Sequence, residues 1–226
     1  MEVRTLWVVI PAFNEATVIG DVISGLRARY PNVVVVDDRS EDDTTNVAVA
    51  AGAVVIRHPI NLGQGAALQT GIRYALQRGA DCIVTFDADG QHQVEDIGVL
   101  LDTHTRTNAD VEIGSRFLGS VKNLPTARRA ILKAAVLFMR ITSGVKLTDA
   151  HNGLRLLTRS AAQRLRITQN RMAHASEIVQ QIHDLRLAVA EAPVTIVYTE
   201  YSLRKGQKLG NAFNILTELF VARLNK

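Results

Sequence analysis

The chain has 226 residues, of which 47% are hydrophobic and 21% are charged, so it can form one globular domain with its own core. Its 26 basic and 22 acidic residues give a formal charge of +4, which suits phosphates or acidic lipids but is too small to indicate nucleic acid. The single cysteine, Cys82, excludes a disulfide framework, and no uncharged apolar run reaches the ~18 residues of a membrane span. The first residues do not resemble a signal peptide, so we expect a cytoplasmic protein.

The first half of the chain alternates between strand-like and helical segments. We expect strands at Thr5–Ile10, Val33–Asp37, Ala53–Arg57 and Cys82–Phe86, and helices at Glu15–Arg29, Asp42–Ala51 and Gly65–Gln77. Continuous Val/Ile runs separated by helices indicate a parallel sheet covered on both faces. Ligands of such sheets bind at the carboxyl ends of the strands, and each polar cluster of this half follows a strand.

The second half is less regular. We expect a strand at Val111–Ser115, a basic helical stretch "TARRAILKAAVLFMRI", a helix at Ala175–Leu187, a strand at Val194–Tyr198 and an amphipathic helix at Leu209–Leu224. No linker divides the chain, which predicts a single domain over residues 1–226. The two apolar, basic-flanked helices suit either a membrane surface or packing against the sheet or a second subunit.

The stretch "VTFDADGQH" predicts a metal site. Asp87, Asp89 and Gln91 alternate after a strand, and on an extended backbone their oxygens point the same way. Mg²⁺ or Mn²⁺ prefers such ligands and also takes phosphate oxygens. The alternative is an Asx-turn with solvated acids.

Two other clusters are candidates for ligand contact. Asp37 and Asp38 end the second strand, where a carboxylate can accept a hydrogen bond from a base or ribose, while Ser40 and the later acids suit a helix cap. Gly65 in "NLGQGAALQTGI" allows close backbone approach to a ligand, or simply begins a helix. This stretch lacks both common nucleotide-binding glycine fingerprints.

In this order, "VVIPAFNE", "VVVVDDRSEDDT", "NLGQGAALQTGI", "FDADGQH", "IGSRF" and "DAHNGLRLL" resemble the family 2 inverting glycosyltransferases. More closely, they resemble the polyprenyl-phosphate hexose synthases, which include the dolichol-phosphate mannose synthases. The resemblance covers about residues 6–210. Processive members carry Q-x-x-R-W, whereas Trp7 is the only tryptophan here, so the chain resembles a single-sugar transferase.

The resemblance implies a GT-A fold, with a mainly parallel Rossmann-like sheet, that binds a UDP- or GDP-linked sugar and Mg²⁺ or Mn²⁺. It implies a nucleotide-sugar half at 1–118 and an acceptor half at 119–226. The resemblance implies that Pro11, Ala12, Asn14 and Glu15 line the nucleoside pocket and that Asp38 reaches the base. It also implies that Asp87, Asp89 and Gln91 lie at the metal, with Asp89 at the ribose as well.

Basic residues suit the charges that this reaction handles. Arg204, Lys205 and Lys208 lie beside Gly206 and suit a lid over the departing diphosphate, although an exposed basic turn is the alternative. Arg116, Arg128 and Arg129 suit a lipid phosphate, with its tail along the apolar helix that follows.

The acceptor decides whether the enzyme needs a base. Glu177 falls where relatives with hydroxyl acceptors place theirs, but with an anionic acceptor it would orient a loop or a cation. Asp149 is a second acid, suited to a cap or a salt bridge. His92, His151 and His174 form no zinc pattern.

We therefore expect transfer of one hexose to polyprenyl phosphate by a peripheral protein on the cytoplasmic membrane face, with a homo-oligomer left open. The alternatives are a glycan or other hydroxyl acceptor in cell-envelope polysaccharide assembly, a sugar-nucleotide pyrophosphorylase, and a non-catalytic nucleotide-binding module. "PAFNEATVIG" lacks the cations of a pyrophosphorylase, and metal ligands with a basic lid would be superfluous in a binding module.

Overall fold

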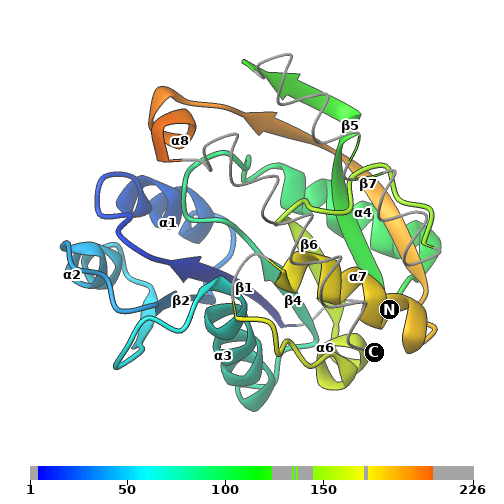
Figure 1. Ribbon diagram of the computed structural model, residues 1–226, viewed down its shortest axis with the longest axis horizontal. Helices are drawn as coiled ribbons and strands as arrows, with labels where there is room; N and C mark the ends of the chain where they lie inside the picture. The colour runs from blue at the N-terminus through cyan, green and yellow to red at the C-terminus, as the bar shows by residue number, and fades with distance from the viewer. Residues whose placement is uncertain (1–4, 124–133, 135, 137–144, 171–172, 206–226) are drawn as a thin grey trace.

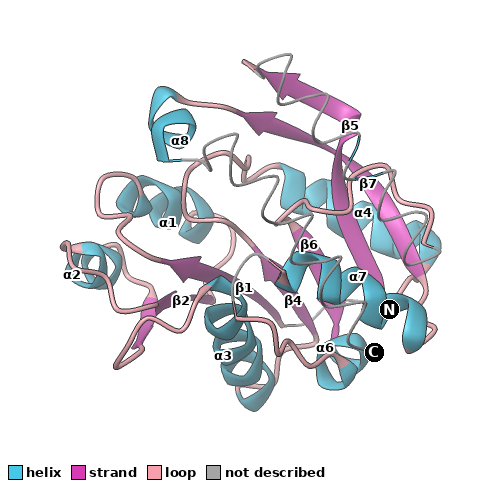
Figure 2. Cartoon of the chain, in the orientation of Figure 1, coloured by secondary structure: helices cyan, strands magenta, loops and turns pink. Residues whose placement is uncertain are grey.

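The computed structural model describes residues 5–123, 134, 136, 145–170 and 173–205, in which a seven-stranded sheet lies between helices (Figures 1 and 2). The strand order is β3-β2-β1-β4-β6-β5-β7. These strands are β1 (Leu6–Ala12), β2 (Val33–Asp37), β3 (Val54–Arg57), β4 (Cys82–Thr85), β5 (Val111–Lys122), β6 (Arg155–Thr158) and β7 (Val189–Val197).

The sheet is mainly parallel. β1 pairs in parallel with β2 and β4, and β2 pairs in parallel with β3. β6 is antiparallel to both of its neighbours, β4 and β5, and β5 pairs in parallel with β7. The carboxyl ends of β1 to β5 and the start of β6 therefore share one edge.

Helices cover both faces because successive strand residues point to opposite sides. One core contains Val9, Val34 and Ile83 and packs against α3 (Gln64–Gln77), α6 (Arg159–Arg164) and α7 (His174–Asp184). The other contains Val8, Val35 and Val84 and packs against α1 (Ile19–Arg27), α2 (Thr44–Ala50) and α4 (Asp96–Thr107). The short α8 (Glu200–Lys205) follows β7. The expected α/β sheet is confirmed.

Several elements differ from the sequence-based expectations. α1 begins at Ile19 rather than Glu15, β5 runs on to Lys122, and α4, β6, α6 and α8 were not expected. The proposed division near residue 118 falls inside β5, so the two functional halves share a strand. Arg128, Arg129, Lys208, the helix at Leu209–Leu224 and most of 126–141 lie outside the described residues. None of the described helices is long and apolar enough to cross a bilayer.

Candidate active site

The polar clusters of the sequence meet at one edge of the sheet. "PAFNE", "DDRSEDDT", "RHPINLGQG" and "DADGQH" follow the parallel strands β1, β2, β3 and β4. β6 begins at the same edge because it is antiparallel, and its first residue, Arg155, pairs with Thr85. The segment 148–153 before β6 therefore joins the four loops.

Asp87 is held at both carboxylate oxygens. The side-chain amide of Gln64 donates to Oδ1 at 3.3 Å, and Nε2 of His92 lies 3.1 Å from Oδ2. Burial by itself would raise the pKa of Asp87, but the hydrogen bond and charge of His92 and the charge of Arg155 lower it overall. Asp87 is thus an oriented carboxylate, ionised at neutral pH, with 32% of its side chain exposed.

The segment after β4 turns instead of continuing as a strand. Ala88 and Asp89 form a turn, Gly90 has a φ of 74°, and Oδ1 of Asp89 accepts from the N–H of Gln91 at 3.0 Å. This bond, two residues along the chain, is an Asx-turn. The extended backbone assumed for the Asp87, Asp89 and Gln91 alternation is therefore wrong, while their shared cation stays a prediction.

The surroundings of Asp89 suit a cation. Burial and the nearby charge of Asp87 raise the pKa of Asp89 to about 6. A divalent ion between the two carboxylates would offset their repulsion, and Mg²⁺ or Mn²⁺ accepts such oxygen ligands. Among the described residues, no three His, Cys, Asp or Glu side chains converge on a metal site. A cation here would therefore need further ligands of other kinds.

Asp37 and Asp38, predicted as nucleotide contacts, are engaged with the protein. Asp38 is 3% exposed and accepts from the N–H groups of Leu62 at 2.9 Å and Gly63 at 2.6 Å, with Nδ1 of His58 at 2.8 Å. Asp37 accepts from the N–H of Ser40 at 2.8 Å and from the hydroxyl of Thr45. Both acids hold the loops around the site, and their contact with a nucleotide stays a prediction.

Gly65, also predicted as a nucleotide contact, lies under the segment 168–170. Its N–H donates to the carbonyl of Asn170 at 2.8 Å, and a Cβ on Gly65 would lie 2.0 Å from the carbonyl oxygen of Gln169. Glycine is thus required here by the approach of the protein's own backbone. Together with Asp38, which binds Gly63, this segment fixes the start of α3 and hence Gln64.

Glu177 holds that same segment in place. Its carboxylate accepts from the N–H of Thr168 at 3.0 and 3.1 Å, from the Thr168 hydroxyl at 2.5 Å and from the N–H of Gln169 at 2.9 Å. Such a carboxylate orients a loop, which is the role expected with an anionic acceptor. Its oxygens point at backbone donors, so proton removal from a substrate would require these bonds to break.

The "PAFNE" loop packs against α8. Pro11 and Ala12 are buried, and Glu15 is 8% exposed. Nζ of Lys205 lies 2.8 Å from Oε1 of Glu15 and donates to the carbonyl of Phe13 at 2.9 Å, while the hydroxyl of Tyr201 donates to Oε2 of Glu15 at 2.8 Å.

Other contacts fix Asn14, and they separate the two cations of the predicted lid. The Asn14 side chain accepts from the N–H of Glu41 at 2.8 Å, and its backbone adopts a φ of 56°. Arg204 and Lys205 are both exposed, and Lys205 also donates to the Asn14 carbonyl. Lys205 therefore joins α8 to the loop, and Arg204 is exposed to solvent.

Arg116, predicted for the acceptor phosphate, is paired with Asp149. Nε of Arg116 donates to Oδ2 of Asp149 at 2.6 Å, and Nη1 donates to the hydroxyl of Tyr198 at 2.7 Å. Asn152 also donates to this Asp149 oxygen, at 3.1 Å. Asp149 is 1% exposed and acts as a salt-bridge partner, one of the roles expected for it.

Four residues of the site were missed from the sequence as contributors: Gln64, His92, Arg155 and Tyr201. Gln64 and His92 lie in stretches that were quoted, but their contacts with Asp87 join residues 23 and 5 positions apart. Arg155 is 1% exposed and enters through the antiparallel strand β6, whose direction no sequence pattern indicated.

The mixed seven-stranded sheet, with Asp87 and Asp89 following its central strand β4, is the fold of GT-A glycosyltransferases, as a solved structure shows. The chain has a TM-score of 0.76 with glucosyl-3-phosphoglycerate synthase from Mycobacterium tuberculosis in complex with Mn²⁺ and UDP-glucose. That match covers 98% of this chain and 78% of the other at 19% identity, which shows the fold. Residues 7–166 match the Glycosyl transferase family 2 model, and the chain belongs to this family.

Two relatives are named as transferases that act on polyprenyl phosphates. The chain is 29% identical to the UDP-N-acetylglucosamine–dolichyl-phosphate N-acetylglucosaminyltransferase of Methanococcus voltae, over 99% of this chain and 98% of the relative. It is 33% identical to the undecaprenyl-phosphate mannosyltransferase of Micrococcus luteus, over 85% and 83% respectively. The chain is therefore a glycosyltransferase similar to polyprenyl-phosphate sugar transferases.

Proposed function

We propose that this protein is a metal-dependent inverting glycosyltransferase that moves one hexose from a UDP- or GDP-linked sugar to polyprenyl phosphate. Asp87, Asp89 and Gln91 would hold Mg²⁺ or Mn²⁺ at the donor site. The enzyme works at the cytoplasmic face of the membrane, where its lipid acceptor is anchored. The names of the relatives support this acceptor class.

The observation that carries the proposal is the hydrogen bonding of Glu177 and Asp149, the two acids that could serve as a base for a hydroxyl acceptor. Glu177 binds the segment at Thr168 and Gln169, and Asp149 binds Arg116 and Asn152. A hydroxyl acceptor must lose a proton to a positioned base. A phosphate acceptor is already anionic and needs cations to position it, so engaged carboxylates favour a phosphate.

The reaction is a single displacement. An oxygen of the acceptor phosphate forms a bond to the anomeric carbon from the face opposite the diphosphate. The bond from that carbon to the diphosphate oxygen breaks, and its electron pair leaves with the nucleoside diphosphate. A metal ion held by Asp87, Asp89 and Gln91 would neutralise part of the charge that leaves with the diphosphate. Lys205 and Arg204 add positive charge beside the leaving group, and Arg116 with Arg128 and Arg129 orients the acceptor.

Matched acceptors test the proposal. The purified protein is incubated with a panel of UDP- and GDP-sugars, Mn²⁺ or Mg²⁺, and either polyprenyl phosphate or the polyprenol of the same chain length. Released nucleotide and lipid-linked sugar are both measured. We expect transfer to the phosphate only, from one donor of the panel, and loss of transfer with EDTA. An Asp89→Ala variant should fold but lose metal-dependent nucleotide binding.

Two outcomes would overturn the proposal. Transfer to polyprenol or to a glycan hydroxyl, with a Glu177→Gln variant inactive, would indicate a hydroxyl acceptor and a catalytic base. Unchanged metal-dependent nucleotide affinity in Asp89→Ala would remove Asp89 from the metal site.

An Arg128→Ala, Arg129→Ala double variant should weaken use of the lipid phosphate while sparing donor binding.

A further inference from the structure

Arg155 places a positive charge inside the sheet, on the strand next to the one that leads to Asp87 and Asp89. It is the first residue of β6 and pairs with Thr85 of β4 and Ile113 of β5. Asp87 follows Thr85 by two positions, just beyond the end of β4, and a Cβ on Gly153, two positions before Arg155, would lie 2.1 Å from Oδ2 of Asp87. Arg155 is 1% exposed, and such burial is rare for arginine unless a partner binds the guanidinium.

The guanidinium of Arg155 is not paired with the acids of the site among the described residues. Its Nε lacks a hydrogen bond, and neither Asp87 nor Asp149 forms an ion pair with it. Both acids have other partners, namely Gln64 and His92 for Asp87 and Arg116 for Asp149. Arg155 therefore acts on the two acids through its charge rather than through a bond.

The charge of Arg155 persists at neutral pH. Burial lowers the pKa of Arg155 to about 10, and the charges of Asp87 and Asp149 oppose that decrease. A buried charge is screened weakly, so the field of Arg155 reaches the Asp87 carboxylate and lowers its pKa, although His92 has the larger effect. That field stabilises the carboxylate when the site is empty of cations, and it repels any cation that binds there.

We propose that Arg155 is a positioning residue whose charge keeps the aspartate site from holding a divalent cation alone, so that metal and nucleotide diphosphate bind together. The inference rests on the proposed function. Its basis is the small number of ligands that the protein offers, namely the carboxylates of Asp87 and Asp89 and the amide of Gln91. The buried positive charge of Arg155 opposes a cation at these ligands. The diphosphate adds oxygen ligands and negative charge, which offset the repulsion by Arg155.

Mn²⁺ binding to the wild-type protein provides the first test. Free Mn²⁺ is titrated by electron paramagnetic resonance, without nucleotide and with saturating UDP or GDP. We expect Mn²⁺ to bind at least about tenfold more tightly with the nucleotide that the enzyme uses. Because the coupling is reciprocal, Mn²⁺ should tighten nucleotide binding by the same factor in calorimetry.

Substitution of Arg155 provides the second test. Arg155→Met removes the charge and keeps most of the volume, so Mn²⁺ alone should bind about tenfold more tightly and its coupling to nucleotide should shrink. A purely structural role for Arg155 would weaken Mn²⁺ binding instead. Arg155→Lys keeps the charge and should behave as the wild type. Arg73→Met, on the exposed side of α3, is the matched control and should change nothing.

The outcomes separate this inference from the proposed function. If the wild type binds Mn²⁺ equally well with and without nucleotide, or if folded Arg155→Met gains no Mn²⁺ affinity, the inference fails and the proposed function stands. If no Mn²⁺–nucleotide complex binds to the wild type, both fail. Circular dichroism and thermal melting establish folding. Should Arg155→Met not fold, the wild-type coupling and Arg155→Lys still decide.

Discussion

At the scale of single residues, Gly153 leaves no room for a side chain beside Asp87. A Cβ there would lie 2.1 Å from Oδ2 of Asp87, and its carbonyl accepts from the hydroxyl of Thr85 at 2.6 Å. A Gly153→Ala change should displace the Asp87 carboxylate and lower kcat/KM on the order of 10²-fold, because small misplacements of reacting groups are costly. The measurement is initial rate against donor concentration, alongside a thermal melt.

Gly98 offers the matched control for Gly153. It lies in α4, where an added Cβ would meet nothing within 4 Å. Gly98→Ala should leave turnover unchanged and raise the free energy of unfolding by about 0.5–1 kcal/mol, because alanine favours the helix. Wild-type turnover in Gly153→Ala would show that Asp87 tolerates displacement, which would contradict its role in the site.

Glu177 allows the roles of base and loop anchor to be told apart. Glu177→Gln removes the negative charge that four donor contacts share, so we expect the Thr168–Gln169 segment to loosen. With lipid phosphate as acceptor, kcat should fall less than about tenfold and its pH profile should keep its shape, since no proton is transferred. A loss of about 10²-fold or more would indicate a base.

At the scale of elements, α8 is the part whose movement matters most for the donor. Lys205→Ala should loosen α8 from the Glu15 loop, because Lys205 supplies the ion pair and contacts with two carbonyls, while Tyr201 keeps its hydrogen bond to Glu15. We expect faster hydrogen exchange at Tyr201–Lys205 and weaker binding of the nucleoside diphosphate. Mass spectrometry and calorimetry measure the two effects.

Arg204→Ala is the control for this prediction. Arg204 is exposed beside Lys205, so its loss should lower turnover, as expected for a lid, without changing hydrogen exchange in α8. If Arg204→Ala and Lys205→Ala both turn over like the wild type, α8 and its cations form a surface turn rather than a lid.

The elements also show which parts of the fold the sequence could predict. The run at Val33–Asp37 is fully buried and apolar until its last residue, and it was predicted to the residue. β6 was missed because Arg155–Thr158 is short and starts with a charge. α4 was missed because its buried face includes Thr103 and His104, which are polar.

The site was predicted as a set of positions, but its contacts were not. The loops after parallel strands must converge, so the acids at Asp87, Asp89 and Asp38 could be placed at one edge. Their hydrogen-bond partners depend on tertiary packing, as with Lys205 and the Asn14 carbonyl, which lie 191 positions apart. Sequence patterns report local periodicity and therefore miss such pairs.

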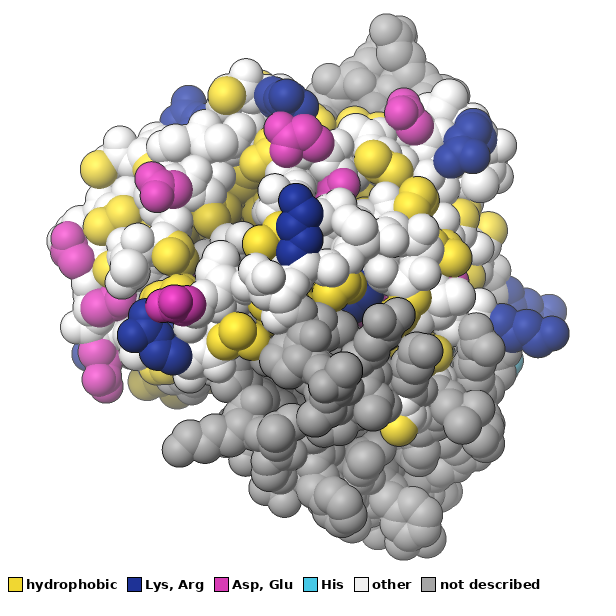
Figure 3. Space-filling model, turned by 90° about the horizontal axis from the view of Figure 1, so that it is seen from above, with side chains coloured by type: hydrophobic (Ala, Val, Ile, Leu, Met, Phe, Trp, Pro, Cys, Tyr) yellow, Lys and Arg dark blue, Asp and Glu magenta, His cyan; other side chains and the backbone are white. Residues whose placement is uncertain are grey.

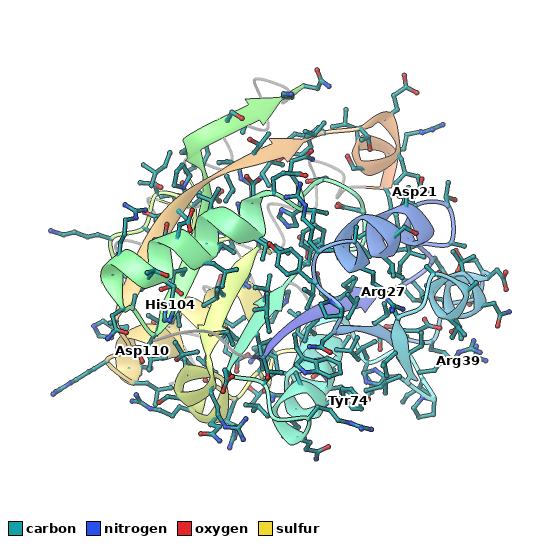
Figure 4. All side chains as sticks on the ribbon, turned by 180° about the vertical axis from the view of Figure 1, so that it is seen from behind. Asp21, Arg27, Arg39, Tyr74, His104 and Asp110 are labelled. Atoms are coloured by element: carbon teal, nitrogen blue, oxygen red, sulfur yellow. The ribbon has the colours of Figure 1, made fainter. Side chains whose placement is uncertain are left out.

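At the scale of the whole molecule, charge is dispersed over the surface. In Figure 3, the visible acidic and basic side chains of the described residues are scattered rather than gathered in one patch. A pair of titratable residues is buried rather than on the surface. It lies far from the site, at the C-terminal end of α4, where His104 is labelled in Figure 4. Nδ1 of His104 lies 3.0 Å from Oε1 of Glu112, which is fully buried, and Oε2 of Glu112 lacks a hydrogen bond.

This buried pair makes stability depend on pH. Burial raises the pKa of Glu112 to about 7 from an ordinary value of 4.5, so the folded state holds a proton that the unfolded state has lost. The resulting stabilisation is complete below pH 4.5 and is lost as pH rises through about 7. Its size is about 3 kcal/mol at most.

Glu112→Gln should remove this dependence, because an amide can still accept from His104 and does not titrate. Urea unfolding at a series of pH values should show the free energy of unfolding of the variant rising relative to that of the wild type between pH 4.5 and about 7. Turnover of the variant should equal that of the wild type throughout. A constant difference between the two proteins across this range would contradict the prediction.

Burial of the lone thiol has a practical consequence for chemical labelling. Cys82 is 0% exposed, and burial, with the charges of Glu112 and Asp81, raises its pKa to about 11. Maleimides react with thiolates, so the natural protein should stay unlabelled near neutral pH. A cysteine introduced at the exposed Leu203 of α8 would then carry a fluorophore at one site only. Its emission would follow the docking of α8 in real time, in an otherwise unaltered enzyme.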